Sequence, residues 1–402
     1  MSASIRPVFV IDAARTAIGR FGGRLATVRP DDLAAEVLSA LLRRNPQAEG
    51  QIEEVILGCA NQAGEDNRNV ARMAVLIAGL PYDVPAHTIN RLCASGLDAV
   101  NAGARMIALG EADVVMAGGV ECMSRAPWSV PKPFTEPPRG NNTMYDTALG
   151  WRYPNPRLEA RFPLEGMGET AENLATRYDI SREEQDAFAL HSHQKAVAAM
   201  QAGRFAEELI VVQAQAGKAK VPVDADEGPR ADTTMESLAK LRAAFRQGGT
   251  VTAGNSSTLN DGAAGVLLAS EAAVLRHGWQ PLARWVGAAQ AGVEPSYMGI
   301  GPVPAMARLL GRIGWKISDL DVIELNEAFA AQSIAVLRQW DIDRSRVNPN
   351  GGAIALGHPL GSSGARLVAT LLHELKRNGG KRGVATLCVG VGQGVATAFE
   401  RP

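Results

Sequence analysis

The sequence predicts an α/β fold made of two related halves, with a long irregular segment inserted between them. In the first third of the 402 residues, short apolar runs alternate with helical patterns. Residues 127–163 then hold eight of the 22 prolines, too many for regular helices or strands of any length. The last third returns to the opening pattern. A chain of this length exceeds the usual size of one core, so two or three domains are expected.

The opening third contains the clearest candidate strands and helices. Apolar runs at residues 8–11, 55–57 and 114–117 have the length of buried strands. Residues 97–109 follow a helical pattern. An earlier helix, opened by Pro30, has an apolar face of Leu33, Val37, Leu38, Leu41 and Leu42. Strands that alternate with helices indicate a parallel sheet covered on both faces.

We interpret residues 123–259 as an insertion into this scaffold. Its proline-rich part is followed by helices, one of which is predicted to start at the capping box SREE, residues 181–184. Long irregular segments inside compact proteins are often functional loops. The rest of the chain divides into an N-terminal half, residues 1–122 with 260–280, and a C-terminal half, residues 281–402.

Two nearly equal offsets suggest that the halves are duplicated units. Val322 precedes a loop rich in polar residues, as Val55 does 267 residues earlier. Cys93 and His358, 265 residues apart, each precede an amphipathic helix and then a strand. The two would then stand at the N-termini of corresponding helices, and a pseudo-two-fold axis would bring these ends together.

Charge and hydropathy exclude several classes of protein. The net charge is −1 without a block of like charge, whereas a nucleic-acid binder would show a basic face. The apolar run at residues 8–11 is too short for a signal-peptide core and is interrupted by Asp12. No stretch approaches the length of a transmembrane helix. We therefore expect a cytoplasmic protein without nucleic-acid or membrane partners.

The four cysteines give no reason to expect a metal site or a disulfide. Cys59, Cys93, Cys122 and Cys388 are far apart, without a CxxC pair or a histidine at ligand spacing. Without an export signal, disulfides are not expected either. Cys59 and Cys122 are interpreted as small buried apolar residues.

Cys93 and Asn326 lie at strand-to-helix junctions. In NRLCASG, residues 90–96, the positive end of the following helix would stabilise a Cys93 thiolate. In NEAFAAQ, residues 326–332, Asn326 ends a strand and Glu327 begins a helix, so the amide could orient a water or simply cap the helix.

Two glycine-rich segments hold the other candidates. His358 lies among five glycines in residues 348–366 and is a candidate general base, or else a surface histidine. In LCVGVGQG, residues 387–394, Cys388 ends a strand. The glycines after it suit a turn with free N–H groups, as in an oxyanion hole, although such turns are common.

Together and in this order, these segments resemble the thiolase family over almost the whole chain. Further matching segments, GGVECMSRAPW, GTVTAGNSSTLNDGAA and MGIGPVPA, begin at residues 118, 249 and 298. The second cysteine distinguishes the pattern from that of the related ketoacyl synthases. The resemblance implies a layered αβαβα core, a homodimer or homotetramer, and coenzyme A as a substrate, with no permanently bound cofactor and no metal.

The resemblance also implies roles for the candidate residues. Cys93 would carry the acyl group, His358 would take its proton, and Cys388 would exchange a proton with the α-carbon of acetyl-CoA. Asn326 would hold a water that, with His358, stabilises the enolate oxygen. The N–H groups of Cys93 and Gly390 would form a second oxyanion hole. Kinetics should be ping-pong.

Coenzyme A should bind along the inserted segment. The resemblance implies that Ser257 contacts the pantetheine arm and that Arg230 and Phe245 line the adenine side of the groove.

Within the family, the chain most resembles the 3-oxoadipyl-CoA thiolases of aromatic catabolism, in the β-ketoadipate pathway. The segments that indicate this are GCANQAGEDNRNVARMA and MYDTALGWRYPNP, which begin at residues 58 and 144. Gly166 also stands where many thiolases have a histidine.

A dicarboxylic substrate needs a cation for its free carboxylate. The insertion offers Arg152, Arg157 and Arg161, each of which could equally be a solvated surface charge; Arg68 and Arg72 lie outside it.

Three alternatives remain open at this point. The first is a general 3-ketoacyl-CoA or acetoacetyl-CoA thiolase. The second is a thiol redox protein that uses Cys93 and Cys388 and needs no His358. The third is an inactive acyl-CoA-binding scaffold, which the intact set of Cys93, His358, Cys388 and Asn326 argues against.

Overall fold

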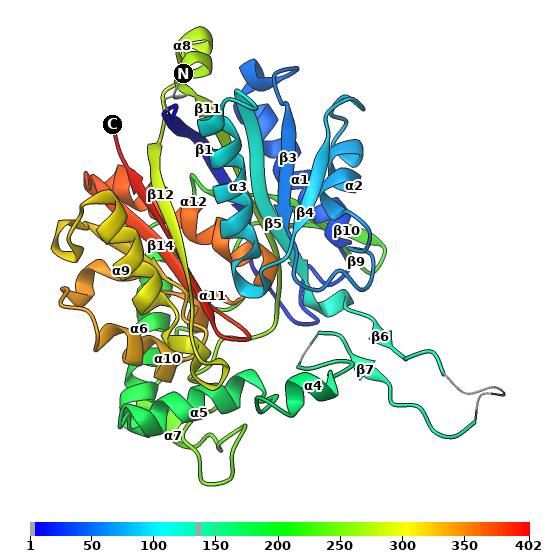
Figure 1. The fold of residues 1–402 in the computed structure, drawn as a ribbon, viewed down its shortest axis with the longest axis vertical. Coiled ribbons are helices and arrows are strands. Elements are labelled where there is room, and N and C mark those ends of the chain that lie inside the picture. Colours follow the sequence, from blue (N-terminus) through cyan, green and yellow to red (C-terminus); the bar gives the residue numbers. More distant parts are fainter. Residues whose placement is uncertain (1–4, 134–136, 138, 149) are drawn as a thin grey trace.

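The computed structural model describes residues 5–133, 137, 139–148 and 150–402. Residues 1–4, 134–136, 138 and 149, which belong to the expected N-terminal half and insertion, lie outside the described residues. Within the described chain, the largest element is a sheet of 11 strands that continues through both halves (Figure 1).

The two halves of the sheet repeat one arrangement of strands. The N-terminal half has the order β1 (Val8–Thr16), β11 (Asn260–Ser270), β5 (Val114–Cys122), β3 (Glu54–Gly58) and β4 (Ala86–Ile89). The C-terminal half has the order β12 (Ala283–Gly292), β15 (Gln393–Glu400), β14 (Arg382–Val389) and β13 (Val322–Leu325). From β1 and from β12, successive neighbours pair antiparallel, antiparallel and then parallel. The expected duplication of α/β halves is confirmed by this shared topology.

The expectation of a parallel sheet is wrong for the strands at the centre. Antiparallel pairs join β1 to β11, β11 to β5, and β14 to β15. The last pair is linked by only residues 390–392, and a connection this short requires antiparallel strands, whereas parallel strands need a long crossover. The halves themselves meet where Val8 on β1 pairs antiparallel with Trp285 on β12.

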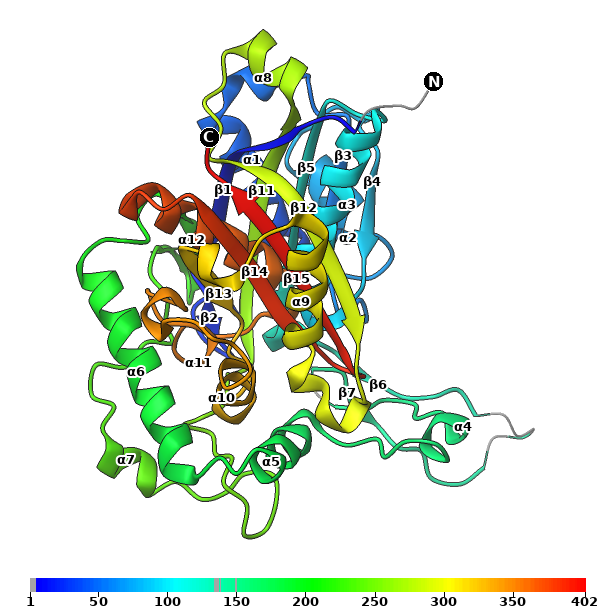
Figure 2. The ribbon, with the colours of Figure 1, turned by 60° about the vertical axis from the view of Figure 1, so that its left-hand side comes forward.

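The helices form three layers around the two halves of the sheet, which confirms the expected αβαβα core. In the middle layer, α3 (Ser95–Leu109) and α12 (Leu360–Asn378) share one apolar core with both halves. Because it is enclosed on both sides, α12 is buried from Gly361 to Leu375. The outer layers are α1 (Pro30–Arg44) and α2 (Val70–Ile77) on one face, and α9 (Pro302–Ile313) and α10 (Ala330–Leu337) on the other. Figure 2 shows α9 against β12 and β15.

Local sequence signals set the ends of these helices. Pro30 occupies the first turn of α1 with Asp31 and Asp32, while Arg43 and Arg44 lie in its last turn, an arrangement that favours the helix dipole. The capping box predicted at the start of α6 is confirmed, since Ser181 and Glu184 exchange side-chain and backbone hydrogen bonds.

The segment between β5 and β11 combines an arm with a helical part. The arm, made of β6 (Trp128–Ser129), β7 (Tyr145–Asp146) and α4 (Pro156–Glu159), extends away from the body (Figures 1 and 2). Helix α5 (Met167–Arg177) packs against α10, and α6 (Arg182–Gln201) packs against α10 and α11 (Ala353–Leu356). The same segment also contains β8 (Leu209–Ile210), β9 (Val212–Ala216), β10 (Ala219–Val223) and α7 (Met235–Ala239). Outside it, β2 (Gly19–Arg20) pairs with β11, and α8 (Glu271–His277) follows β11.

A buried charge cluster ties this segment to the scaffold. Arg15 on β1 forms ion pairs with Glu208 at 2.6 Å and with Asp226 at 2.7 Å. All three side chains are almost completely buried, so the opposite charges must offset the cost of removing one another from water. The part of the insertion that follows α6 is thereby fixed to the first strand of the sheet.

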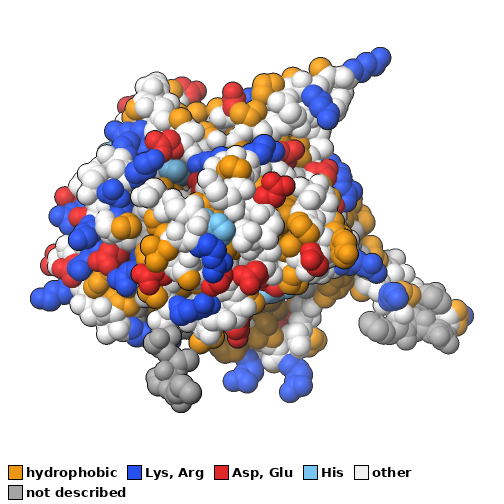
Figure 3. Space-filling model, turned by 90° about the horizontal axis from the view of Figure 1, so that it is seen from above, with side chains coloured by type: hydrophobic (Ala, Val, Ile, Leu, Met, Phe, Trp, Pro, Cys, Tyr) orange, Lys and Arg blue, Asp and Glu red, His pale blue; other side chains and the backbone are white. Residues whose placement is uncertain are grey.

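The distribution of charged side chains on the surface and the hydropathy of the helices agree with the expectations from the sequence. On the face in Figure 3, acidic and basic side chains are interspersed. Of the helices that the structure describes, none is both long and apolar enough to span a bilayer.

Candidate active site

Cys93 lies in a strained turn at the N-terminal end of α3. The turn, Leu92–Ala94, is a 3-10 turn that leads directly into the helix. Leu92 has φ +46°, a left-handed conformation that is rare for leucine. Its N–H donates to Asn90 Oδ1, and its carbonyl oxygen accepts from Ser95 Oγ. Hydrogen bonds on both sides hold this strain and fix the position of the thiol.

The Cys93 thiol is protonated at neutral pH. Burial raises its pKa to about 11, although the N–H groups of Gly390 and of Cys93 itself face the sulfur and lower it. The backbone N–H groups at the helix end do lower the pKa of Cys93, as expected, but burial has the larger effect and raises it. Loss of solvent outweighs the partial charge of a helix terminus. Cys93 needs a base before it can act as a nucleophile.

Cys388 approaches the same site from β14. It is the second-last residue of that strand and is almost fully buried. Burial raises the pKa of its thiol well above the ordinary value, and the nearby Cys93 raises it further. Next comes the turn at residues 390–392, where Val391 and Gly392 have φ +62° and +83°. This turn brings the N–H of Gly390 to Cys93.

His358 precedes α12, and its two ring nitrogens have different partners. Nδ1 lies 2.7 Å from Ser363 Oγ, and that hydroxyl donates to the carbonyl oxygen of Pro359. Since a hydroxyl has one hydrogen, Nδ1 carries the ring proton and Nε2 is the acceptor. Burial, and then the positive charge of Arg366, lower the pKa of His358 to about 3. The ring is therefore neutral and can accept a proton at Nε2.

Asn260 fixes the backbone at His358. The N–H of His358 donates to Asn260 Oδ1 over 2.8 Å, and Asn260 Nδ2 donates to the carbonyl oxygen of Gly19. Gly357 has φ +111°, and a side chain there would collide with Asn260. Sequence patterns do not single out Asn260, although it lies in the motif segment that begins at residue 249.

The side chain of Asn326 reaches His358. Its Nδ2 lies 3.3 Å from Nε2 of the imidazole, and its Oδ1 has no hydrogen-bond partner in the described part of the chain. Helix α10 begins at Ala330, so Asn326 does not cap it and Glu327 does not begin it. The amide is thus available to a ligand or a water.

Glu327 holds the loop of Asn326 in place. Its carboxylate accepts from Asn348 Nδ2 over 2.8 Å and from Ser192 Oγ over 2.6 Å. A side chain at Gly352 would collide with this carboxylate. Glu327 thereby connects the segment after β13, the glycine-rich segment before His358, and α6.

The N-termini of α3 and α12 touch through glycines. A side chain at Gly96 would collide with the carbonyl oxygen of Gly361, and one at Gly364 would collide with the backbone of Leu97. The turn that holds Cys93 also contacts both α12 and β14. Between the described side chains of Cys93 and His358 there is no direct hydrogen bond, and such contacts often tighten only with substrate bound.

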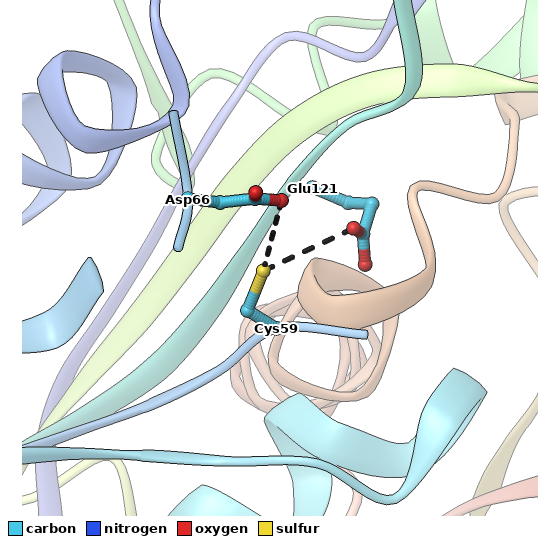
Figure 4. Close-up of side chains that lie close together, drawn as sticks. All are labelled: Cys59, Asp66 and Glu121. Atoms are coloured by element: carbon cyan, nitrogen blue, oxygen red, sulfur yellow. Dashed lines mark hydrogen bonds between the residues drawn. The ribbon is translucent and has the colours of Figure 1, made fainter. Parts of the chain in front are cut away.

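A buried acidic cluster lies beside the start of α12 (Figure 4). The thiol of Cys59 donates to Asp66 Oδ2 over 3.5 Å and lies 3.9 Å from Glu121 Oε1. Glu121 also accepts from the N–H groups of Ala60, Asn61 and Gly361, and burial raises its pKa to about 7. Peptide donors already satisfy these carboxylates. The cluster therefore fixes the segment after β3 to α12, and Cys59 is not merely an apolar filler.

The residues expected to bind coenzyme A lie along the later part of the insertion. Phe245 is 44% exposed and meets Phe329 edge-on, with ring centroids 6.0 Å apart. A side chain at Gly168 on α5 would collide with the Phe245 ring. The N–H of Ser257 donates to the carbonyl oxygen of Ala328. Phe245 and Ser257 thus both contact the NEAF segment.

Arg230 lies beside α6. Its N–H donates to His193 Nδ1, and with residues of α6 it lines a shallow cavity. Among described residues, no carboxylate pairs with its exposed guanidinium.

The five candidate arginines for a distal carboxylate are placed differently. Arg68, Arg157 and Arg161 are exposed, and Arg161 lies over the ring of Phe162. Arg72 donates to the carbonyl oxygens of Tyr82 and Val84, near the edge of the sheet. Arg152 alone of the insertion's three is half-buried.

Comparisons with known proteins point to one family. Residues 8–272 match the family model "Thiolase, N-terminal domain", and residues 279–401 match "Thiolase, C-terminal domain". The chain is 58% identical to the "Beta-ketoadipyl-CoA thiolase" of Pseudomonas knackmussii, over 98% of this chain and 99% of that protein. It is 53% identical to the "3-oxoadipyl-CoA/3-oxo-5,6-dehydrosuberyl-CoA thiolase" of Escherichia coli, over 99% and 100%. The solved structure of the Bacillus anthracis acetyl-CoA acetyltransferase superimposes with a TM-score of 0.94 at 43% identity, with full coverage of both chains (100%).

Proposed function

Because this chain belongs to the thiolase family and is therefore an acyltransferase, we propose that it cleaves 3-oxoadipyl-CoA with coenzyme A. The products are succinyl-CoA and acetyl-CoA. The relatives from Pseudomonas knackmussii and Escherichia coli carry names that refer to this substrate. The redox hypothesis finds no support in these relationships.

The observation that supports the chemistry best is that two thiols meet at one site. Cys93 lies beside the N–H of Gly390, and the buried Cys388 is near Cys93. The reaction has two tasks, covalent capture of an acyl group and proton transfer to carbon, and one thiol can serve each. Cys93 attacks the 3-keto carbon, and the bond between C2 and C3 breaks. The acyl group stays on Cys93, and Cys388 protonates the departing enolate to give acetyl-CoA.

His358 and Asn326 complete the proposed machinery. Nε2 of His358 takes the thiol proton of Cys93, because Nδ1 is engaged with Ser363. The unpartnered Oδ1 of Asn326 supports its role in holding a water near the enolate oxygen. The N–H groups of Cys93 and Gly390, which face the sulfur, are suited to bind the oxygen of the acyl-enzyme carbonyl. Free coenzyme A then takes the acyl group and returns the proton to the enzyme.

We further propose that coenzyme A lies along the insertion. Ser257 contacts the pantetheine arm, and Arg230 and Phe245 form the adenine side. The division into residues 1–122 with 260–280, 123–259 and 281–402 belongs to this proposal, as do cytoplasmic location and assembly into a homodimer or homotetramer.

Thiolysis rates for matched substrates test the proposal. The values of kcat/KM for 3-oxoadipyl-CoA, acetoacetyl-CoA and a longer 3-oxoacyl-CoA should rank 3-oxoadipyl-CoA first. Equal rates, or a preference for an apolar chain, would replace the proposal with a general 3-ketoacyl-CoA or acetoacetyl-CoA thiolase.

A further inference from the structure

We propose that Arg152 is the residue that binds the distal carboxylate of the acyl group and so determines specificity; this inference rests on the proposed function. Arg152 lies in the arm between β7 and α4, and the residue is half-buried. Nη1 donates to the carbonyl oxygen of Thr147 over 2.8 Å, and Nη2 donates to that of Asn61 over 3.0 Å.

The charge of Arg152 is not compensated within the described chain. No ion pair to Arg152 occurs among residues 5–133, 137, 139–148 and 150–402, whereas most half-buried arginines of the body have a carboxylate partner. Two of its five N–H groups bind carbonyl oxygens, which are neutral. Nε–H and one hydrogen on each Nη nitrogen remain, and a carboxylate can accept two parallel hydrogen bonds from Nε–H and the neighbouring Nη–H.

Two chains of contacts connect Arg152 to the surroundings of Cys93. On one side, Arg152 binds Asn61, and Asn90 binds the adjacent carbonyl oxygen of Ala60 over 2.9 Å. Asn90 also accepts from the N–H of Leu92, directly before Cys93. On this side, residues 60–61, which bind Asn90, therefore connect Arg152 to the turn that holds Cys93.

On the other side, Trp151 donates from its indole N–H to the carbonyl oxygen of Glu165 over 3.1 Å. The chain continues through Gly166 to Met167, whose sulfur would lie 3.6 Å from a side-chain carbon at Gly390. A side-chain carbon at Gly166 would meet nothing within 4 Å. Arg152 thus stands between two segments of chain that both lead to the turns of Cys93 and Gly390.

The test compares two substrates of equal chain length that differ at one end, 3-oxoadipyl-CoA and 3-oxohexanoyl-CoA. In Arg152→Met, kcat/KM for 3-oxoadipyl-CoA should fall by about a hundredfold. The value for 3-oxohexanoyl-CoA should stay within about threefold of wild type. Arg152→Gln keeps a donor for the carbonyl oxygens without the charge, and it should show the same selective loss. Arg157→Met, an exposed arginine of the same segment, is the matched control and should change neither value.

The outcomes separate this inference from the proposed function. If the wild type favours 3-oxoadipyl-CoA and both Arg152 variants keep that ratio, the carboxylate is bound elsewhere and only this inference fails. An equal loss for both substrates assigns Arg152 a structural role and also overturns the inference. If the wild type shows no preference for 3-oxoadipyl-CoA, the proposed function fails first.

Discussion

Nδ1 of His358 donates to the hydroxyl oxygen of Ser363 over 2.7 Å, and that hydroxyl donates in turn to the carbonyl oxygen of Pro359. Ser363 lies in the first turn of α12 and is completely buried. The start of one helix therefore fixes which ring nitrogen of His358 is free to accept a proton.

Replacing Ser363 by alanine should remove this control of the tautomer. A buried donor that loses its partner costs about 1–3 kcal/mol, so kcat for thiolysis should fall roughly 5- to 150-fold. Steady-state rates and a melting curve measure the effect. Ser362→Ala, at the neighbouring buried serine, serves as the control and should keep near-normal activity. Equal losses in both variants would assign the effect to helix packing.

Cys388→Ala should separate the two chemical steps. Without the acid that protonates the enolate, thiolysis should slow by about 10²- to 10⁴-fold. Acetylation of Cys93 by acetyl-CoA should persist, because that step needs His358 and not Cys388. Intact-mass measurement after incubation with acetyl-CoA shows the acetyl group directly. Cys122→Ala, outside the site, should retain both activities; a folded Cys388→Ala enzyme that takes up no acetyl group would contradict this division of roles.

The pH dependence of Cys93 alkylation should distinguish a neutral thiol from a thiolate. With the pKa of Cys93 raised to about 11 and that of His358 lowered to about 3, the thiol is protonated and the imidazole neutral throughout pH 5–9. The rate of reaction with iodoacetamide at Cys93 should rise about tenfold per pH unit across this range. Peptide mass spectrometry assigns the site. A rate that is constant above about pH 5 would instead indicate a thiolate–imidazolium pair.

Arg230→Ala should weaken the binding of coenzyme A. Its exposed guanidinium contributes attraction shared by the ground and transition states, so KM for CoA should rise roughly fivefold while kcat changes little. Arg105→Ala, at an exposed arginine of α3, provides the control. An unchanged KM for CoA would place the nucleotide elsewhere.

The proposed catalytic residues can be recognised in the sequence because each lies in a segment rich in small residues that the structure requires. Cys93, His358 and Cys388 each stand beside glycines, and the structure explains why: at Gly96, Gly357 and Gly392, a side chain would collide with the backbone or with Asn260. The duplicated halves were predictable for a similar reason, since helices and strands recur at nearly constant offsets.

The supporting residues could not be found in this way. Glu121 reaches Gly361 across 240 residues, and Asn260 reaches His358 across 98, and a single sequence carries no sign of such pairs. The direction of the central strands depends on which strands become neighbours after the insertion. The pKa of Cys93 depends on burial, which arises only when α3, α12 and β14 close around it.

The acyl-enzyme itself tests the central claim most directly. Wild-type enzyme incubated with 3-oxoadipyl-CoA, without free coenzyme A, should gain the mass of one succinyl group and release acetyl-CoA. Peptide mapping should place the group on Cys93, and Cys93→Ser should gain none, because a serine hydroxyl is a far weaker nucleophile at neutral pH. Turnover without any acyl-enzyme, or a succinyl group on another residue, would contradict the account.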